Sequence, residues 1–232
     1  MHIEKNKSTY IYITLYSIFT ILIWQIPFGR YILFPFTILG TWFHEISHGL
    51  FSIILGGNFL RLEIFQDGSG IAVHTGDLFM GEIGNAIVAG AGPMGPAFFG
   101  TILIRSSFNE KTSKYALMTL ALFQILSTII WIRSFFGFVI IIIIGMSLLF
   151  ISVKSSYIII KNTIVFLGIQ AFLSLYLSIG YLFTQSGNIG GKSFVSDTGV
   201  MQNSLYLPYW FWAISIIFVS ITLFFLSLKK YL

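Results

Sequence analysis

The chain has 232 residues, of which 56% are hydrophobic and only 9% are charged. A soluble domain carries roughly 25% charged residues, so this composition, with a mean hydropathy of +0.89, excludes an ordinary soluble protein and indicates one integral to a membrane. The 13 lysines and arginines are scattered through short loops and helix ends, where they anchor helices at the membrane surface, and we expect no nucleic-acid partner. Because there is no cysteine, any metal must be held by His, Asp or Glu.

Apolar stretches of spanning length, roughly 20 residues, predict about seven transmembrane helices. They cover residues 10–27, 31–56, 85–104, 115–132, 135–153, 160–184 and 207–228. The predicted fold is an all-α polytopic membrane protein in which residues 1–232 form a single domain embedded in the lipid bilayer. The first stretch lacks a small-residue cleavage site, so we expect a retained helix and not a signal peptide. With seven spans, the distribution of Lys and Arg predicts a cytoplasmic C-terminus.

The second predicted span contains His44-Glu45-Ile46-Ser47-His48, which places ionisable groups inside an apolar run. A charged residue near the bilayer centre costs on the order of 3 kcal/mol, so such residues indicate a functional site. On a helix His44 and His48 share one face, and Glu45 lies beside them. This is the H-E-x-x-H arrangement, in which two histidines bind zinc and the glutamate is the general base for hydrolysis.

Directly after this span, residues 58–77 have the pattern of a short β-hairpin. Two partly alternating runs, 59–65 and 71–75, flank the turn sequence Gln66-Asp67-Gly68-Ser69-Gly70. A hairpin beside the zinc helix offers an edge that pairs with an extended substrate segment. The alternative is a solvated linker.

The third predicted span begins with Ala89-Gly90-Ala91-Gly92-Pro93-Met94-Gly95-Pro96. Small residues at this density allow helix backbones to approach closely, and two prolines predict a break or kink. One interpretation is helix packing alone. The other is a kinked helix that packs on the zinc helix and forms one wall of the active cavity.

A zinc site with two histidines needs a third protein ligand if its fourth position is to stay open for water. Asp197 is a candidate because it lies in the polar loop predicted for residues 185–203, with Ser196 beside it as a possible helix cap. Asp197 could instead be the N-cap itself. His74 of the predicted hairpin is a rival ligand, and Asp77 is a further one.

Together these motifs resemble the site-2 protease class of intramembrane zinc metallopeptidases, peptidase family M50, and within it the M50B-like branch. The elements that resemble this branch are Gly56-Gly57, the turn Asp67-Gly68-Ser69-Gly70 and the dipeptide Ser196-Asp197. The resemblance covers residues 40–215, and the most specific part of it is the His-Glu-His element.

The resemblance implies that Zn²⁺ is bound by His44, His48 and Asp197, and that Glu45 activates the attacking water. It implies hydrolysis of a peptide bond in or near a transmembrane segment of a membrane-protein substrate. It also implies a multi-pass membrane protein, which we expect in the cell (inner) membrane of a bacterium.

Two features depart from better-characterised site-2 proteases. Their third ligand comes in a Leu-Asp-Gly or Asn-Pro-x-Asp-Gly context, whereas here Asp197 lies in Val-Ser-Asp-Thr-Gly. They also carry Ala-Gly-Pro-x-x-Asn. Alignment on Ala91-Gly92-Pro93 puts Pro96 in the place of that asparagine, so a polar contact to the substrate is missing. Two other functions therefore stay open: a catalytically inactive M50-like membrane scaffold that regulates a partner, and a divalent-metal transporter. The substrate-binding residues and the oligomeric state are not predicted.

Overall fold

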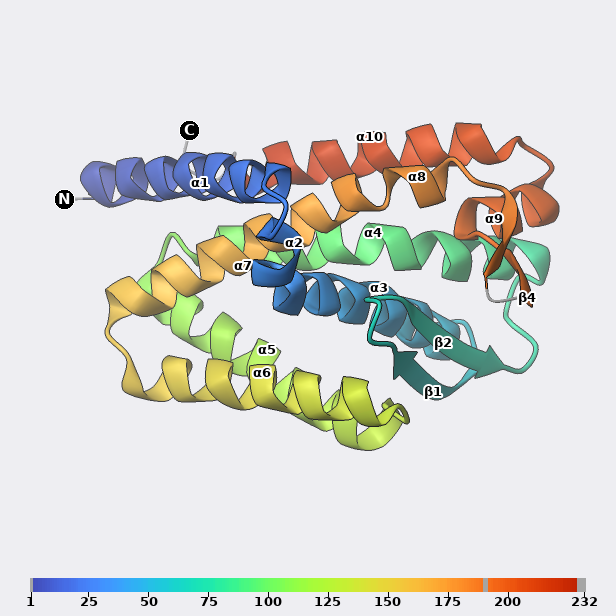
Figure 1. The fold of residues 1–232 in the computed structure, drawn as a ribbon, viewed down its shortest axis with the longest axis horizontal. Helices are drawn as coiled ribbons and strands as arrows, with labels where there is room; N and C mark the ends of the chain where they lie inside the picture. Colours follow the sequence, from blue (N-terminus) through green and yellow to red (C-terminus); the bar gives the residue numbers. More distant parts are fainter. Residues whose placement is uncertain (1, 190–191, 229–232) are drawn as a thin grey trace.

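The computed structural model describes residues 2–189 and 192–228 of the chain. Its elements in chain order are α1 (His2–Gln25), α2 (Gly29–Ile32), α3 (Phe34–Ile54), β1 (Asn58–Ile64), β2 (Gly70–Thr75), α4 (Glu82–Ser106), α5 (Glu110–Trp131), α6 (Phe135–Lys154), α7 (Tyr157–Leu177), α8 (Ile179–Leu182), β3 (Ser186–Ile189), β4 (Lys192–Val195), α9 (Asp197–Leu205) and α10 (Tyr209–Leu228). The long helices form one bundle, and both hairpins lie towards the same end of it (Figure 1).

The described helices confirm an all-α polytopic membrane protein with a small hairpin after the third helix. Five of them are long and apolar enough to cross a membrane, namely α4, α5, α6, α7 and α10. Each of the predicted stretches contains a long helix, but α1 and α3 lie outside this group of five. The count of seven spans therefore stays a prediction.

The predicted hairpin is present, with β1 and β2 paired antiparallel from Asn58↔Thr75 to Ile64↔Gly70. The outer edge of β1 is already occupied by the connection between α5 and α6. The carbonyl of Leu62 accepts a hydrogen bond from Arg133 N (2.9 Å), and Ser134 Oγ accepts one from Ile64 N (2.9 Å). The outer edge of β2 faces α3, where the backbone N–H of Ala72 meets the carboxylate of Glu45.

Helix α4 continues through Pro93 and Pro96, so the predicted break does not occur. Each proline removes one intrahelical hydrogen bond, and the same segment of α4 packs closely on α3. A Cβ atom added to Gly95 would lie 2.0 Å from Ser47 Oγ and 2.8 Å from the Phe43 carbonyl of α3. The small residues thus bring α4 onto the helix that carries the histidines.

The polar stretch 185–203, predicted as a loop, instead forms a second hairpin, β3 and β4, followed by the short helix α9. The strands are four residues each and lack a clear alternation, so no sequence pattern indicates them. Ser196 is the N-cap of α9, because its Oγ accepts a hydrogen bond from Gly199 N at 3.1 Å. Asp197 is therefore the first residue of α9, and the interpretation of Asp197 as the cap is wrong.

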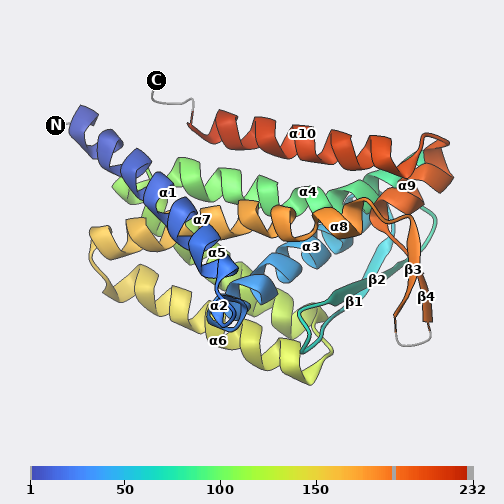
Figure 2. The same ribbon diagram turned by 45° about the horizontal axis from the view of Figure 1, so that its top comes forward.

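Both ends of the described chain lie at the end of the bundle opposite the hairpins (Figures 1 and 2). Tyr10 Oη of α1 donates a hydrogen bond to the Leu228 carbonyl at the end of α10 (3.1 Å), and Arg105 at the end of α4 reaches the Leu226 carbonyl (3.3 Å). Helices α1 and α3 run in the same sense along the bundle (Figure 1). We therefore expect α1 and α3 to complete one crossing between them, which would make the number of crossings even instead of the seven predicted from the sequence.

Basic residues beside the ends of the long helices and on strand β1 are unequally distributed between the two ends of the bundle. At the end that holds the termini lie Arg105, Lys111, Lys114, Lys154 and Lys161, whereas Arg61 and Arg133 lie at the hairpin end. By the positive-inside rule we expect the richer end in the cytoplasm. Both ends of the described chain would then be cytoplasmic, and the hairpins would face the opposite side.

This topology predicts the accessibility of single cysteines, which can be introduced freely because the natural chain has none. In intact cells a membrane-impermeant maleimide should label Asp67→Cys but neither Lys5→Cys nor Lys111→Cys, and all three should react after lysis. Unequal protection of the cysteines at positions 5 and 111 would contradict an even number of crossings.

Candidate metal centre

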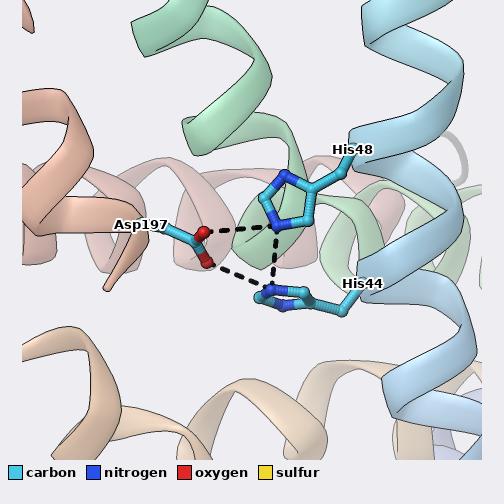
Figure 3. A group of neighbouring side chains, drawn as sticks. All are labelled: His44, His48 and Asp197. Carbon is cyan, nitrogen blue, oxygen red and sulfur yellow. Dashed lines mark hydrogen bonds and ion pairs between the residues drawn. The ribbon is translucent and has the colours of Figure 1, made fainter. Parts of the chain in front are cut away.

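His44 and His48 lie one turn apart on α3 and present their rings to the same point (Figure 3). Their Nε2 atoms are 3.1 Å apart, and the ring planes are inclined by 73°. The spacing of four residues places both side chains on one helical face. The two imidazoles can therefore act on a single ion.

Asp197 reaches the same point from the first turn of α9 (Figure 3). Its Oδ2 lies 3.1 Å from His44 Nε2, and its Oδ1 lies 3.3 Å from His48 Nε2. The ligand atoms of the three side chains lie within 4.8 Å of one another and could hold a metal ion. The structure thus brings together the three residues proposed as ligands.

A backbone carbonyl orients one of these imidazoles. His48 Nδ1 lies 2.8 Å from the carbonyl oxygen of Val88 on α4. A carbonyl only accepts hydrogen bonds, so Nδ1 carries the proton and a neutral His48 presents the lone pair of Nε2 to Asp197 and His44. This is the arrangement by which a second hydrogen bond prepares histidine for metal binding.

The site concentrates electron-rich atoms with little access to water. The side chains of His44, His48 and Asp197 are 17%, 11% and 12% exposed, and Asp197 Oδ2 is a buried oxygen without a hydrogen-bond partner. Burial raises the pKa of Asp197, but the positive charge of a protonated imidazole beside it would outweigh burial and hold the pKa of that carboxyl below its usual range. A metal cation at the same place would act in the same direction. An ionised, unsatisfied oxygen beside two ring nitrogens fits a cation, which removes the cost of burying it.

Glu45 follows the first histidine on α3 and is buried against strand β2. Its carboxylate lies near the backbone N–H of Ala72, and a Cβ atom added to Gly70 would lie 2.7 Å from Glu45 Cγ. Only a residue without a side chain allows the strand to come this close. The hairpin therefore forms the wall next to Glu45.

All four of these side chains line one cavity of about 1170 Å³. Its walls come from α3, β2, α4, the end of α7 and α9, and it extends past the exposed residues Asp67, Ser69 and Glu82. The spacing of residues along a span cannot show whether water reaches the histidines. In the folded chain a partly polar cavity leads to them.

The rival ligands lie elsewhere. His74 on β2 lines the same cavity but is not one of the converging groups, and Asp77 is exposed outside it. Burial lowers the pKa of His74, which favours a neutral imidazole. Tyr181 of α8 also lines the cavity, and no sequence pattern marks it, since it is one tyrosine at the end of an apolar stretch.

Fold and site together define a polytopic membrane protein with a buried His-His-Asp group that could hold a metal ion. The sequence profile of the family described as Peptidase M50B-like matches residues 12–227. The chain therefore belongs to this family, whose members are metallopeptidases, and the predicted branch is confirmed. No curated protein and no solved structure matches the chain.

Gly92 offers a direct test of the contact between α4 and the site. A Cβ atom at this position would lie 2.1 Å from His48 Nε2, so Gly92→Ala should push the ring away and lower metal affinity at least about tenfold. The matched control is Gly90→Ala, where the new methyl group meets only the flexible end of Met201 at 3.3 Å. Metal titration of both purified variants measures the two affinities. Equal affinities would contradict the close approach of α4 to His48 at Gly92.

Proposed function

We propose that this protein is an intramembrane zinc endopeptidase that hydrolyses a peptide bond in or near a transmembrane segment of a membrane-protein substrate. The observation that carries the proposal is the convergence of His44, His48 and Asp197 beside the buried Glu45 in one cavity. Membership of a metallopeptidase family supports hydrolysis of a peptide bond. We place the protein in the inner membrane of a bacterium.

The spacing of the ligand atoms supports zinc. Zinc bonds to histidine nitrogen and carboxylate oxygen are roughly 2.0–2.2 Å long, and tetrahedral ligands at such lengths lie about 3.3 Å apart. The contacts among His44 Nε2, His48 Nε2 and the Asp197 oxygens are 3.1, 3.1 and 3.3 Å. A zinc ion held there would supply a Lewis acid to the scissile carbonyl and to water.

Glu45 is the general base of the proposed reaction. Its carboxylate takes a proton from the attacking water and then delivers a proton to the leaving amine, while the bond between carbonyl carbon and nitrogen breaks. Ala72 N–H and the wall of β2 hold this carboxylate beside the ligands. Its burial keeps bulk water from competing for the transferred proton.

Strand β2 is suited to hold the substrate. Leu62 of β1 points its carbonyl away from β2 to Arg133, so its partner Ala72 points its own backbone groups away from β1 as well. The backbone groups of Gly70 and the carbonyl of Ala72 then face the cavity that these residues line, while the Ala72 N–H is held by Glu45. An extended substrate segment can pair with this edge, which places its carbonyl next to Glu45.

A second candidate function is an inactive scaffold that regulates a membrane partner. Pro96 lines the cavity at the position of the missing asparagine and supplies no polar group there. Asn85 and Asn203 line the same cavity from α4 and α9, so the proposed enzyme has other amides near the substrate. Divalent-metal transport fits less well, because the described residues contain one converging His-His-Asp group and not a series of such groups along a path.

The proposed base predicts a separation of metal binding from catalysis. Glu45→Gln keeps the size of the side chain but removes the proton acceptor, so zinc content and folding should be unchanged while cleavage falls by at least about a hundredfold. Cells that co-express the protein with a library of tagged single-span membrane proteins provide the assay, with the Glu45→Gln variant as a trap for bound substrate. Cleavage at the natural rate by this variant in a purified system would refute the proposed mechanism.

The proposed ligand set predicts one zinc ion per chain in the detergent-purified protein. His48→Ala and Asp197→Ala should each lose it, because two remaining ligands hold zinc far more weakly than three. Elemental analysis of the three proteins is the measurement. Zinc that survives the loss of Asp197 would point to His74 or Asp77 instead, and absence of zinc from the natural protein would favour the scaffold.

A further inference from the structure

The position of Asp197 depends on how the start of α9 is held. The first backbone N–H groups of a helix have no partner within the helix. Here Ser196 Oγ accepts from Gly199 N, and the hydroxyl oxygen of Tyr181 accepts from the backbone N–H of Asp197 at 3.2 Å. The backbone of the proposed third ligand is therefore tied to a side chain of α8.

Two further hydrogen bonds join the same segments on either side of this contact. Thr198 Oγ1 donates to the Leu182 carbonyl at 2.8 Å, and Ser196 Oγ donates to the Thr184 carbonyl. Residues 181–184 thus hold residues 196–198 at three successive positions. Of these contacts, the one from Tyr181 is made to the residue that carries the ligand oxygen.

Aromatic contacts restrain the ring of Tyr181. It lies parallel to Phe194 of β4, with ring centroids 6.4 Å apart and planes inclined by 14°, and its centroid is 6.4 Å from that of His44. Tyr181 therefore touches the hairpin that precedes α9 and faces the first histidine of α3. Tyr181 thus lies between two proposed ligands, His44 and Asp197, which are far apart in the sequence.

We propose that Tyr181 is a positioning residue of the metal centre, whose hydroxyl holds Asp197 at the correct place opposite His44 and His48. This inference rests on the proposed function, because it requires that these residues bind zinc. Partners that orient a metal ligand commonly contribute ten- to hundredfold to metal affinity. Tyr181 acts through Asp197 and is not assigned a contact with the substrate.

The test compares zinc affinity with the stability of the metal-free protein. Tyr181→Phe keeps the ring and its contacts and removes only the hydroxyl, so zinc affinity should fall about tenfold while thermal unfolding of the metal-free protein stays within a few degrees of the natural protein. The control is Tyr176→Phe, which makes the same change at a side chain that is 61% exposed on α7. Competition with a fluorescent zinc chelator measures the affinities.

The outcomes separate this proposal from the proposed function. If the natural protein binds zinc and Tyr181→Phe binds it equally well, the positioning role is refuted, even when the variant is less active. A lower stability of the metal-free protein with unchanged zinc affinity shows a merely structural role and also refutes it. Phe194→Leu loosens the ring while keeping the hydroxyl and should weaken zinc binding in the same direction. A natural protein without zinc refutes the proposed function itself.

Discussion

Two imidazoles on one face of an apolar helix need a partner, and the rest of the structure is arranged around this constraint. His44 and His48 expose their nitrogens to a space that is largely closed to bulk water. The buried carboxylate of Asp197 completes the group from the far end of the sequence. Three electron-rich groups at such short distances are stable together when a cation lies between them. The geometry of the candidate metal centre therefore depends on where α9 places Asp197.

Three segments of the chain pack around His44, His48, Asp197 and Glu45. Helix α4 comes close enough for the Val88 carbonyl to orient His48, which is possible because Gly92 has no side chain. Strand β2 comes close to Glu45 through Gly70. The segment around Tyr181 fixes the start of α9. Both hairpins lie towards one end of the helix bundle (Figure 1), where their residues line the cavity together with those of the helices.

This arrangement suits a reaction that must occur beside a membrane but needs water. The cavity is lined by apolar residues of helices and also by polar residues of the hairpin turn. Substrate backbone in a bilayer is normally helical because its polar groups must be satisfied internally. An open strand edge next to the proposed base offers an alternative set of hydrogen bonds to a segment that has left its helix.

The sequence by itself determined the membrane class, the helix that carries His44 and His48, and the hairpin that follows it. These features depend on local composition and on the periods of helix and strand, which can be read along the chain. Tertiary structure alone decided that Asp197, and not His74 or Asp77, lies beside the two histidines. It alone placed both ends of the described chain at one end of the bundle, formed the second hairpin and brought Tyr181 to the start of α9. Those features depend on contacts between residues far apart in sequence, and no local pattern records which distant side chains meet.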